Sequence, residues 1–190
     1  EMVMSILNNE TFVNDIVEIV DGKNGLDVKF RTLHIGRKVA QLISRNTGAH
    51  IMETFKTTRY DSSRGKWRGV VTISLRLPSI NPGEIVVYKN RPVVIRSVDV
   101  NGITIEFIDD GSVELVKYGE YWNGVLKDSR DIEILKNYKV IGVDKSTIYL
   151  LHEESGEIRE YPVNKYTSRF NNGDTVFIIR FKDREYLVRK

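Results

Sequence analysis

The sequence predicts an α+β fold in which a ββαββ antiparallel-sheet module precedes small β-barrels, SH3-like and then OB-like. Residues 32–46 repeat apolar side chains at helical spacing, and residues 67–77 alternate apolar and polar side chains as a half-buried strand does. After Asn81-Pro82-Gly83 the expected strands are short, and turn signals recur at the spacing typical of barrels. The expected division is a basic ββαββ module at 1–80, an SH3-like barrel at 81–130, and an OB-like or second SH3-like barrel at 131–190.

The first two strands are expected at 16–20 and 26–30, joined by a turn at Asn24-Gly25. Residues 4–15, which precede them, have only weak helical spacing. Asn-Gly is a strong hairpin signal because both residues tolerate positive φ. In the second strand apolar residues alternate with charged ones, so one face is predicted to point inward and the other to solvent.

An amphipathic helix is expected from Thr32 to about Asn46. Thr32 can cap its N-terminus, and Gly48 is placed to end it. Apolar residues recur at i, i+4, i+7 and i+8 from Ile35, which predicts a helix that lies on a core. The opposite side of this helix carries His34, Lys38, Gln41 and Arg45, with Arg37 alongside.

A long hairpin is expected next, from strands at 50–60 and 67–77 and the polar loop 61–66. Together with the first hairpin it would form a four-stranded antiparallel sheet with the helix on its apolar face. The other face of this sheet would be open to solvent. Period-two alternation places on it Lys29, Arg31, Thr54, Lys56, Thr58, Tyr60, Arg68 and Arg76.

The second half of the chain contains a weak internal repeat. Gly83-Glu84-Ile85-Val86 opens one unit, and Gly173-Asp174-Thr175-Val176 repeats that opening near the C-terminus. The meander expected at 138–163 is compatible with an OB-like barrel or with a second SH3-like barrel. Tyr118, Tyr121 and Trp122 could form a protein-binding loop, but we interpret this aromatic group as packing between the barrels.

Composition excludes several kinds of site. The chain has no cysteine, which excludes disulfides, thiolate zinc sites and cysteine nucleophiles. His34, His50 and His152 are scattered without metal-ligand spacing, and no catalytic motif accompanies them. No apolar run approaches the roughly 20 residues that span a bilayer. We therefore expect a non-enzymatic protein without a metal, a cofactor or a membrane partner. The absence of cysteine alone leaves the compartment open, and we further expect a cytoplasmic monomer.

Positive charge is concentrated between residues 29 and 76. That stretch has eleven Lys or Arg and two acids, a net charge of +9, whereas the whole chain has +3 and the remainder therefore −6. A surface that is merely solvated usually interleaves both signs, so the imbalance indicates an anionic partner. The predicted RNA-binding residues are Lys29, Arg31, Arg37, Lys38, Arg45, Lys56, Arg59, Arg64, Lys66, Arg68 and Arg76.

RNA is the expected partner, because a sheet face and an arginine-bearing loop suit irregular RNA better than the regular major groove. The helix cations and the sheet cations lie on opposite sides of the predicted module, so one duplex cannot contact both. Either one set is only solvated, or the module is surrounded by a large structured RNA such as that of a ribosomal subunit. Two alternatives are a protein-interaction module without direct RNA contact and a nucleic-acid-processing enzyme with a hidden acidic metal site.

The order of these elements and a few local phrases resemble a known family. They are the strand Gly25-Leu26-Asp27-Val28-Lys29-Phe30, a basic helix, a strand that ends at Tyr60, and Val71-Thr72-Ile73-Ser74-Leu75 ahead of a Gly-acid-x-Val opening. From about Ile16 to the C-terminus, the chain resembles the nonsense-mediated decay protein three family, the adaptors of the large ribosomal subunit. It looks archaeal because it lacks the long insertions of eukaryotic members.

The resemblance implies binding to rRNA, and to ribosomal proteins, at the joining face of the large subunit, with a role in subunit biogenesis or quality control. It also implies a C-terminal part similar to the hypusine-containing translation factor, an SH3-like barrel followed by an OB-fold. Family members carry an N-terminal region of paired cysteines that bind zinc. Since this chain has no cysteine and begins at Glu1, it is expected to be a fragment that starts after that region.

Overall fold

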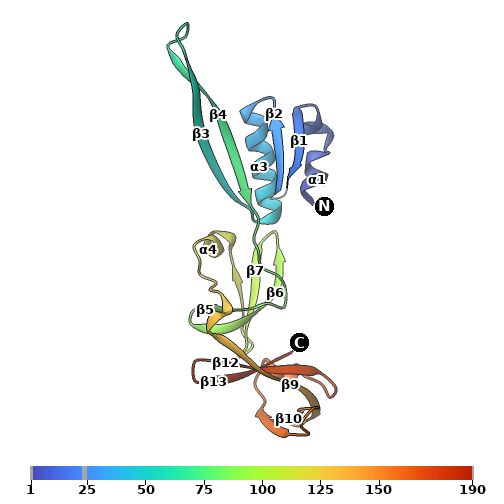
Figure 1. Ribbon diagram of the computed structural model, residues 1–190. Helices are drawn as coiled ribbons and strands as arrows, with labels where there is room; N and C mark the ends of the chain where they lie inside the picture. Colours follow the sequence, from blue (N-terminus) through green and yellow to red (C-terminus); the bar gives the residue numbers. More distant parts are fainter. Residues whose placement is uncertain (1, 23–24, 190) are drawn as a thin grey trace. The chain divides into compact units, whose positions relative to one another are not determined.

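The structure is a computed structural model that describes residues 2–22 and 25–189 (Figure 1). The expected turn at Asn24 and the side chains of residues 66–68 lie outside the described residues. The chain forms two compact units, Glu1–Ser79 and Ile80–Lys190.

The described part of the N-terminal unit contains three helices: α1 (Met2–Leu7), α2 (Glu10–Val13) and α3 (Leu33–Thr47). The backbone N–H of Ile35 donates to the Thr32 hydroxyl at 3.4 Å, and Gly48 ends α3 in the left-handed region with φ 69°. These are the capping residues that the sequence predicted, because the first and last turns of a helix lack intrahelical partners. The prediction of this helix is confirmed.

The strands of the N-terminal unit form two separate hairpins. Strand β1 (Ile16–Gly22) pairs only with β2 (Gly25–Phe30), and β3 (His50–Asp61) pairs only with β4 (Lys66–Arg76), within the described ranges. The order ββαββ is confirmed, but the expected four-stranded sheet is wrong. Alternation determines which face of a strand is buried, whereas it does not determine which edges meet.

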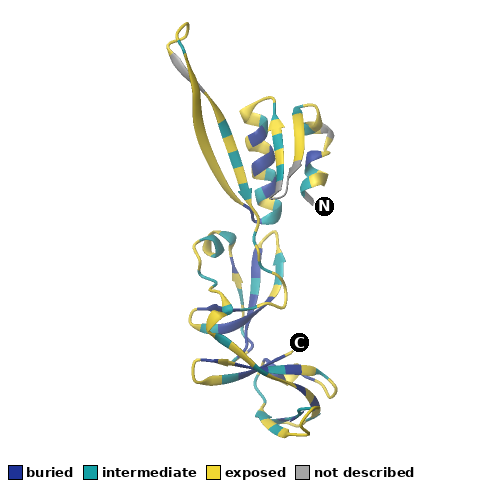
Figure 2. Ribbon diagram, in the orientation of Figure 1, coloured by how far each residue is buried: buried dark blue, intermediate teal, exposed yellow. Residues whose placement is uncertain are grey.

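The core of the N-terminal unit lies around α3. Its fully buried side chains are Leu7, Val39 and Ile43. Partly buried residues of β2 and Leu75 of β4 pack against them, so each hairpin covers the helix independently. Figure 2 shows α3 as the most buried element of this unit, while β3 is exposed over nearly all of its length.

A β-bulge interrupts the long hairpin. The register passes from Thr57 opposite Gly69 to Arg59 opposite Arg68, so Thr58 is the extra residue of β3 at the bulge. One extra residue reverses the alternation of every residue beyond it. The bulge therefore moves Arg59 onto the face that also carries Lys56.

The second unit begins with a four-stranded antiparallel meander. Its strands are β5 (Ile85–Tyr88), β6 (Arg91–Asp99), β7 (Gly102–Phe107) and β8 (Val113–Val116), in that order. The short helix α4 (Tyr118–Trp122) follows. Tyr118 and Tyr121 pack against the core of this sheet, and the Tyr118 hydroxyl donates to the carbonyl of Asp99 at 2.6 Å. This aromatic group packs within the first sheet rather than between barrels.

A five-stranded sheet completes the second unit. Its strands are β9 (Ile132–Val143), β10 (Thr147–Leu151), β11 (Ile158–Pro162), β12 (Thr175–Phe181) and β13 (Arg184–Arg189), with the 3₁₀ turns η1 (Ser129–Asp131) and η2 (Thr167–Arg169). The strand order is β11-β10-β9-β12-β13. The described strand pairings do not close either sheet of this unit into a barrel.

Side chains bring the two edge strands of the five-stranded sheet together. The Tyr161 hydroxyl on β11 donates to the carbonyl of Glu185 on β13 at 3.1 Å and accepts from the N–H of Leu187 at 3.2 Å. Arg159 on β11 also donates to the Glu185 carboxylate at 2.5 Å. The sheet therefore curls until β11 and β13 are joined by side chains instead of a backbone ladder.

The two sheets of the second unit share a core. Val87, Val94 and Ile108 from the first sheet are buried together with residues of β9–β13 such as Val140 and Ile178. Between the sheets, the amide of Asn164 also donates to the carbonyl of Ile108 at 3.3 Å. Residues 80–190 therefore form one compact body.

Candidate nucleic-acid interface

All eleven predicted RNA-binding residues belong to the N-terminal unit. Lys29 and Arg31 lie on and just after β2, and the helix α3 carries Arg37, Lys38 and Arg45. The hairpin of β3 and β4 carries Lys56, Arg59, Arg64, Lys66, Arg68 and Arg76. The side chains of Lys66 and Arg68 lie outside the described residues, and the other nine are exposed.

The register brings one group of these cations together. Lys56 is opposite Val70, Arg59 is opposite Arg68, and Arg76 is opposite His50. Residues directly opposite each other in an antiparallel pair share a face, so Lys56, Arg59 and Arg76 lie on the same side of the hairpin. We call this side, with its intervening Thr54 and Thr72, the cationic face.

The expected open face of eight residues is wrong in two respects. Lys29 and Arg31 belong to the first hairpin, which does not pair with the second among the described residues. Beyond the bulge Tyr60 is opposite Trp67, on the side away from Lys56. The single extra residue at Thr58 caused this error, because sequence alternation alone cannot reveal a bulge.

Arg37 has a partner that the sequence did not suggest. Its Nε donates to the Glu53 carboxylate at 2.8 Å, and a second guanidinium nitrogen contacts the other carboxylate oxygen. The hydrogen bond from Arg37 lowers the pKa of Glu53 below its usual value. Arg37 therefore joins α3 to β3, and it neutralises one of the two acids in the basic stretch.

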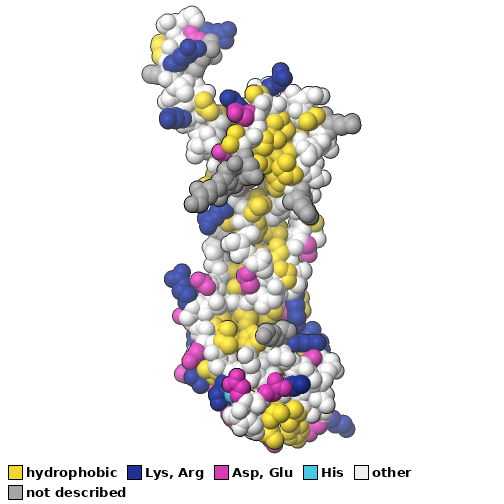
Figure 3. Space-filling model, turned by 45° about the vertical axis from the view of Figure 1, so that its right-hand side comes forward, with side chains coloured by type: hydrophobic (Ala, Val, Ile, Leu, Met, Phe, Trp, Pro, Cys, Tyr) yellow, Lys and Arg dark blue, Asp and Glu magenta, His cyan; other side chains and the backbone are white. Residues whose placement is uncertain are grey.

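The hairpin also exposes apolar side chains. Phe55, Val70 and Met52 are exposed by 61%, 57% and 50%. In the space-filling view of Figure 3, hydrophobic and basic side chains both occur on the projecting hairpin. The exposure of Phe55 was missed, because the sequence places it on the side of the hairpin that faces the helix.

The lengths of the predicted strand and helix could have indicated that Phe55 is exposed. Strand β3 has 12 residues and spans about 40 Å, whereas α3 has 15 residues and spans about 22 Å. The helix cannot cover the whole strand. The far half of the hairpin therefore exposes both of its faces.

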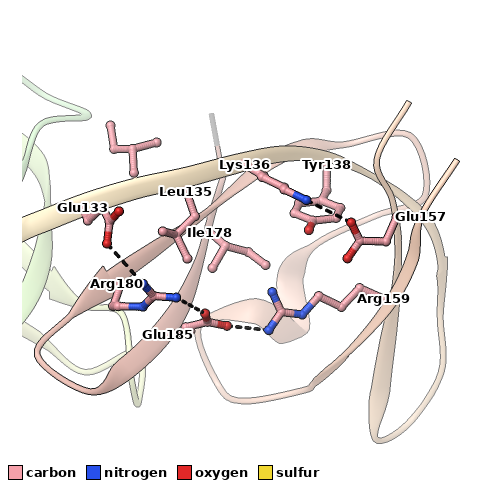
Figure 4. Close-up of a pocket in the computed structure, with 10 residues that line it drawn as sticks. Glu133, Leu135, Lys136, Tyr138, Glu157, Arg159, Ile178, Arg180 and Glu185 are labelled. Carbon is pink, nitrogen blue, oxygen red and sulfur yellow. Dashed lines mark hydrogen bonds and ion pairs between the residues drawn. The ribbon is translucent and has the colours of Figure 1, made fainter. Parts of the chain in front are cut away.

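The second unit contains a charged hollow of about 320 Å³ on its five-stranded sheet (Figure 4). Arg180 contacts Glu133 at 3.3 Å and Glu185 at 3.2 Å, and the Lys136 ammonium lies 3.0 Å from Glu157. Arg159 is the third cation of this hollow and also contacts Glu185. Three cations and three carboxylates balance, so the hollow offers a nucleic acid no net charge.

Within the described ranges 2–22 and 25–189, no three His, Asp or Glu residues are grouped so that they could hold a metal ion. In the same ranges no helix has the length and apolar character needed to cross a membrane.

By its fold, the chain is a β-rich α+β protein. A two-hairpin domain with exposed cations is followed by antiparallel β-sheets. Residues 1–77 match the family described as "NMD3, second domain", a range that nearly coincides with the N-terminal unit. These residues therefore belong to the NMD3 family as its second domain. The NMD3 family is a family of non-enzymatic ribosome adaptors.

No curated protein matches the chain. Among solved structures, the chain is similar to eukaryotic translation initiation factor 5A from Methanococcus jannaschii, with 16% sequence identity over 58% of this chain and 90% of that chain. The TM-score is 0.31, too low to establish a shared fold.

Proposed function

We propose that this chain is a non-enzymatic factor that binds the large ribosomal subunit in the cytoplasm and contacts rRNA through its N-terminal unit. It acts in subunit biogenesis or quality control. One observation carries the proposal: in the NMD3-type domain, the nine described cations of the basic stretch are all exposed. A ribosomal subunit is the partner that combines the family's adaptor role with a large anionic surface.

The charge supports RNA as the direct contact. The eleven cations of the basic stretch repel one another, because only two acids lie among them, and that repulsion destabilises a free domain. An RNA backbone removes the repulsion, since each neutralised phosphate releases condensed counterions. Because Arg37 already pairs with Glu53, we place the main contact on the cationic face of the hairpin rather than on this part of α3.

The shape of the hairpin supports structured RNA over a regular duplex. Two strands without a covering layer can enter a gap between RNA segments and be contacted on both faces. Specific RNA recognition generally uses loops, bulges and unstacked bases, because the major groove of an RNA helix is deep and narrow. A ribosomal subunit presents many such irregular sites.

We also propose the finer division of the second unit, with an SH3-like barrel at 81–130 and an OB-like barrel at 131–190. The order β11-β10-β9-β12-β13, with edges joined through Tyr161, supports the OB-like assignment. An OB-fold is a five-stranded, partly open barrel in which the third and fifth strands meet. In this sheet β11 and β13 occupy those positions.

Co-sedimentation of the 190-residue chain with isolated large ribosomal subunits, over a salt series, tests the proposal. If about five cations touch phosphates, the log-log slope of affinity against salt is roughly −4. The combined variant Lys56→Glu, Arg59→Glu and Arg76→Glu is expected to bind weakly and to lower the magnitude of the slope by roughly two.

A matched variant changes the same number of charges elsewhere: Lys127→Glu, Lys145→Glu and Lys165→Glu, all exposed in the second unit. We expect it to bind as the native chain does. Equal loss in both variants would contradict a contact through the cationic face. Binding that is insensitive to salt and to ribonuclease treatment would favour the alternative, a protein-interaction module built on the β-sheets of the second unit.

A further inference from the structure

Phe55 is an aromatic side chain in an unusual position. It is 61% exposed, and every residue of β3 from His50 to Tyr60 is exposed as well. Phenylalanine is among the residues most often buried, because its ring gains most from leaving water. The exposed ring lies on the part of the hairpin that extends past α3.

The Phe55 ring lies against Gly69 of the neighbouring strand β4. A Cβ atom at Gly69 would lie 2.5 Å from Cζ of Phe55 and 2.5 Å from the carbonyl oxygen of Lys56. The ring therefore lies directly against the backbone of β4 at Gly69, two residues from Val71, the register partner of Phe55. Any side chain at position 69 would displace it. Glycine inside a strand often marks such a close approach.

Covering a glycine with an aromatic ring stabilises a pair of strands, and this accounts for the ring face that contacts Gly69. The contact also orients the ring, because Gly69 and the carbonyl of Lys56 limit where it can lie. Among the side chains that the structure describes, no layer covers the outer face of the ring, and Phe55 remains 61% exposed. It is a fixed aromatic plane of the kind on which a planar ligand stacks.

The charges near Phe55 indicate what stacks on it. Lys56 and Arg59 follow in the same strand and are exposed on the opposite face of the hairpin, whose edges are open because β3 and β4 pair only with each other within the described ranges. Glu53, the nearest acid along the strand, is paired with Arg37, and Asp61 accepts a hydrogen bond from Ser63 at the turn. An apolar protein surface would leave the cations without counterions, whereas a nucleotide supplies both a planar base and a phosphate.

We propose that Phe55, held in place by Gly69, is a stacking platform for an unpaired RNA base. The proposal rests on the proposed function and names the part of the RNA that this side of the hairpin recognises. The base stacks on the ring, and the phosphates of the same RNA strand pass the open edge of β3 to the long side chains of Lys56 and Arg59 on the cationic face. Paired bases are excluded, because the faces of their rings are already covered by the neighbouring base pairs.

Fluorescence anisotropy with the 190-residue chain tests this, using a labelled single-stranded RNA and a fully paired RNA of the same length. We expect Phe55→Leu to weaken binding of the single strand by roughly tenfold, the effect of losing one stacked base. Its salt slope is expected to stay unchanged, since no phosphate contact is lost. Binding of the paired RNA is expected to be unaffected, and Phe55→Trp is expected to retain single-strand binding.

Two further variants complete the test. Val113→Ala shortens an apolar side chain of similar exposure, 58%, in the second unit, and is expected to bind like the native chain. Gly69→Ala displaces the ring and is expected to reproduce the loss seen for Phe55→Leu. Native-like single-strand binding by Phe55→Leu, or an equal loss with paired RNA, would overturn the stacking proposal alone. A native chain that binds neither RNA nor subunits would overturn the proposed function itself.

Discussion

At the scale of single residues, Glu106 is the most constrained charge in the second unit. Its side chain is 1% exposed, and its two carboxylate oxygens contact Arg96 of β6 and Arg169 of η2. Both guanidinium carbons lie 5.6 Å from the centre of the Tyr166 ring. A buried carboxylate needs such partners, because leaving water costs an ion several kcal/mol. The two arginines therefore allow Glu106 to be buried and link η2 to the first sheet.

This arrangement predicts an asymmetry between its members. Glu106→Gln leaves two arginines that are 43% and 53% exposed and can be hydrated, so it is expected to lower the free energy of unfolding by about 1.5–3 kcal/mol. Changing both arginines to Gln leaves a buried carboxylate without a cation and is expected to cost about 3–5 kcal/mol. Urea unfolding measures both values. A smaller loss in the double variant than in Glu106→Gln would contradict this account.

The other ion pair of interest, Arg37 with Glu53, has a different role. Both side chains are exposed, by 51% and 36%, and exposed pairs contribute little to stability. The pair instead positions α3 against β3 and neutralises Glu53 beside Phe55. Sequence reasoning placed Arg37 among the RNA-binding residues because a partner 16 positions away cannot be seen from local spacing.

At the scale of secondary-structure elements, the β3–β4 hairpin departs most from the sequence prediction. Alternation correctly predicted its strands, and it predicted that Ile73 and Leu75 point inward. It did not predict that the hairpin is longer than the helix or that a bulge at Thr58 rearranges the far half. Isolated two-stranded hairpins are marginally stable in water. The near half of this hairpin packs against α3, whereas the far half extends past the helix and, among the described residues, has only its own two strands to stabilise it.

Hydrogen exchange should reveal that difference. Amides of the near half, around Glu53 and Ile73, are expected to be protected by the packing of α3. Amides of the far half, from Phe55 to Tyr60, are expected to exchange about tenfold faster or more, because local opening there exposes little additional apolar surface. Exchange measured by mass spectrometry on overlapping peptides, with buried β12 as the internal reference, checks this. Uniform protection along β3 would contradict it.

At the scale of the whole molecule, the two units have separate hydrophobic cores and different net charges. The core around α3 contains residues of the N-terminal unit only, and the clusters of the second unit draw their members from residue 80 onward. Residues 80–190 carry 17 basic and 18 acidic residues, a net charge of −1. Stability and anion attraction are therefore separate properties of separate units.

A truncation tests this separation. A chain of residues 80–190 is expected to unfold cooperatively in urea, since its buried cluster is complete without the N-terminal unit. It is also expected to lose the salt-dependent part of subunit binding, because its net charge is near zero. Loss of cooperative unfolding would show that its core depends on residues 1–79. Binding that keeps the native salt slope would place the RNA contact in the second unit.

The sequence by itself determined the features whose causes lie within a few residues. Thr32 and Gly48 limit α3, alternation defines the strands, and the count of charges between 29 and 76 marks the N-terminal unit as the basic one. It also carried the family resemblance, which the family match confirms for residues 1–77.

Only the tertiary structure decided how these elements combine. It separated the two hairpins, moved Tyr60 and Arg59 to opposite faces, paired Arg37 with Glu53, and left Phe55 exposed on Gly69. The physical reason is the range of the interactions. Helix caps and alternation act between neighbouring residues, whereas edge pairing, bulges and uncovered faces depend on contacts between segments that are distant in the chain.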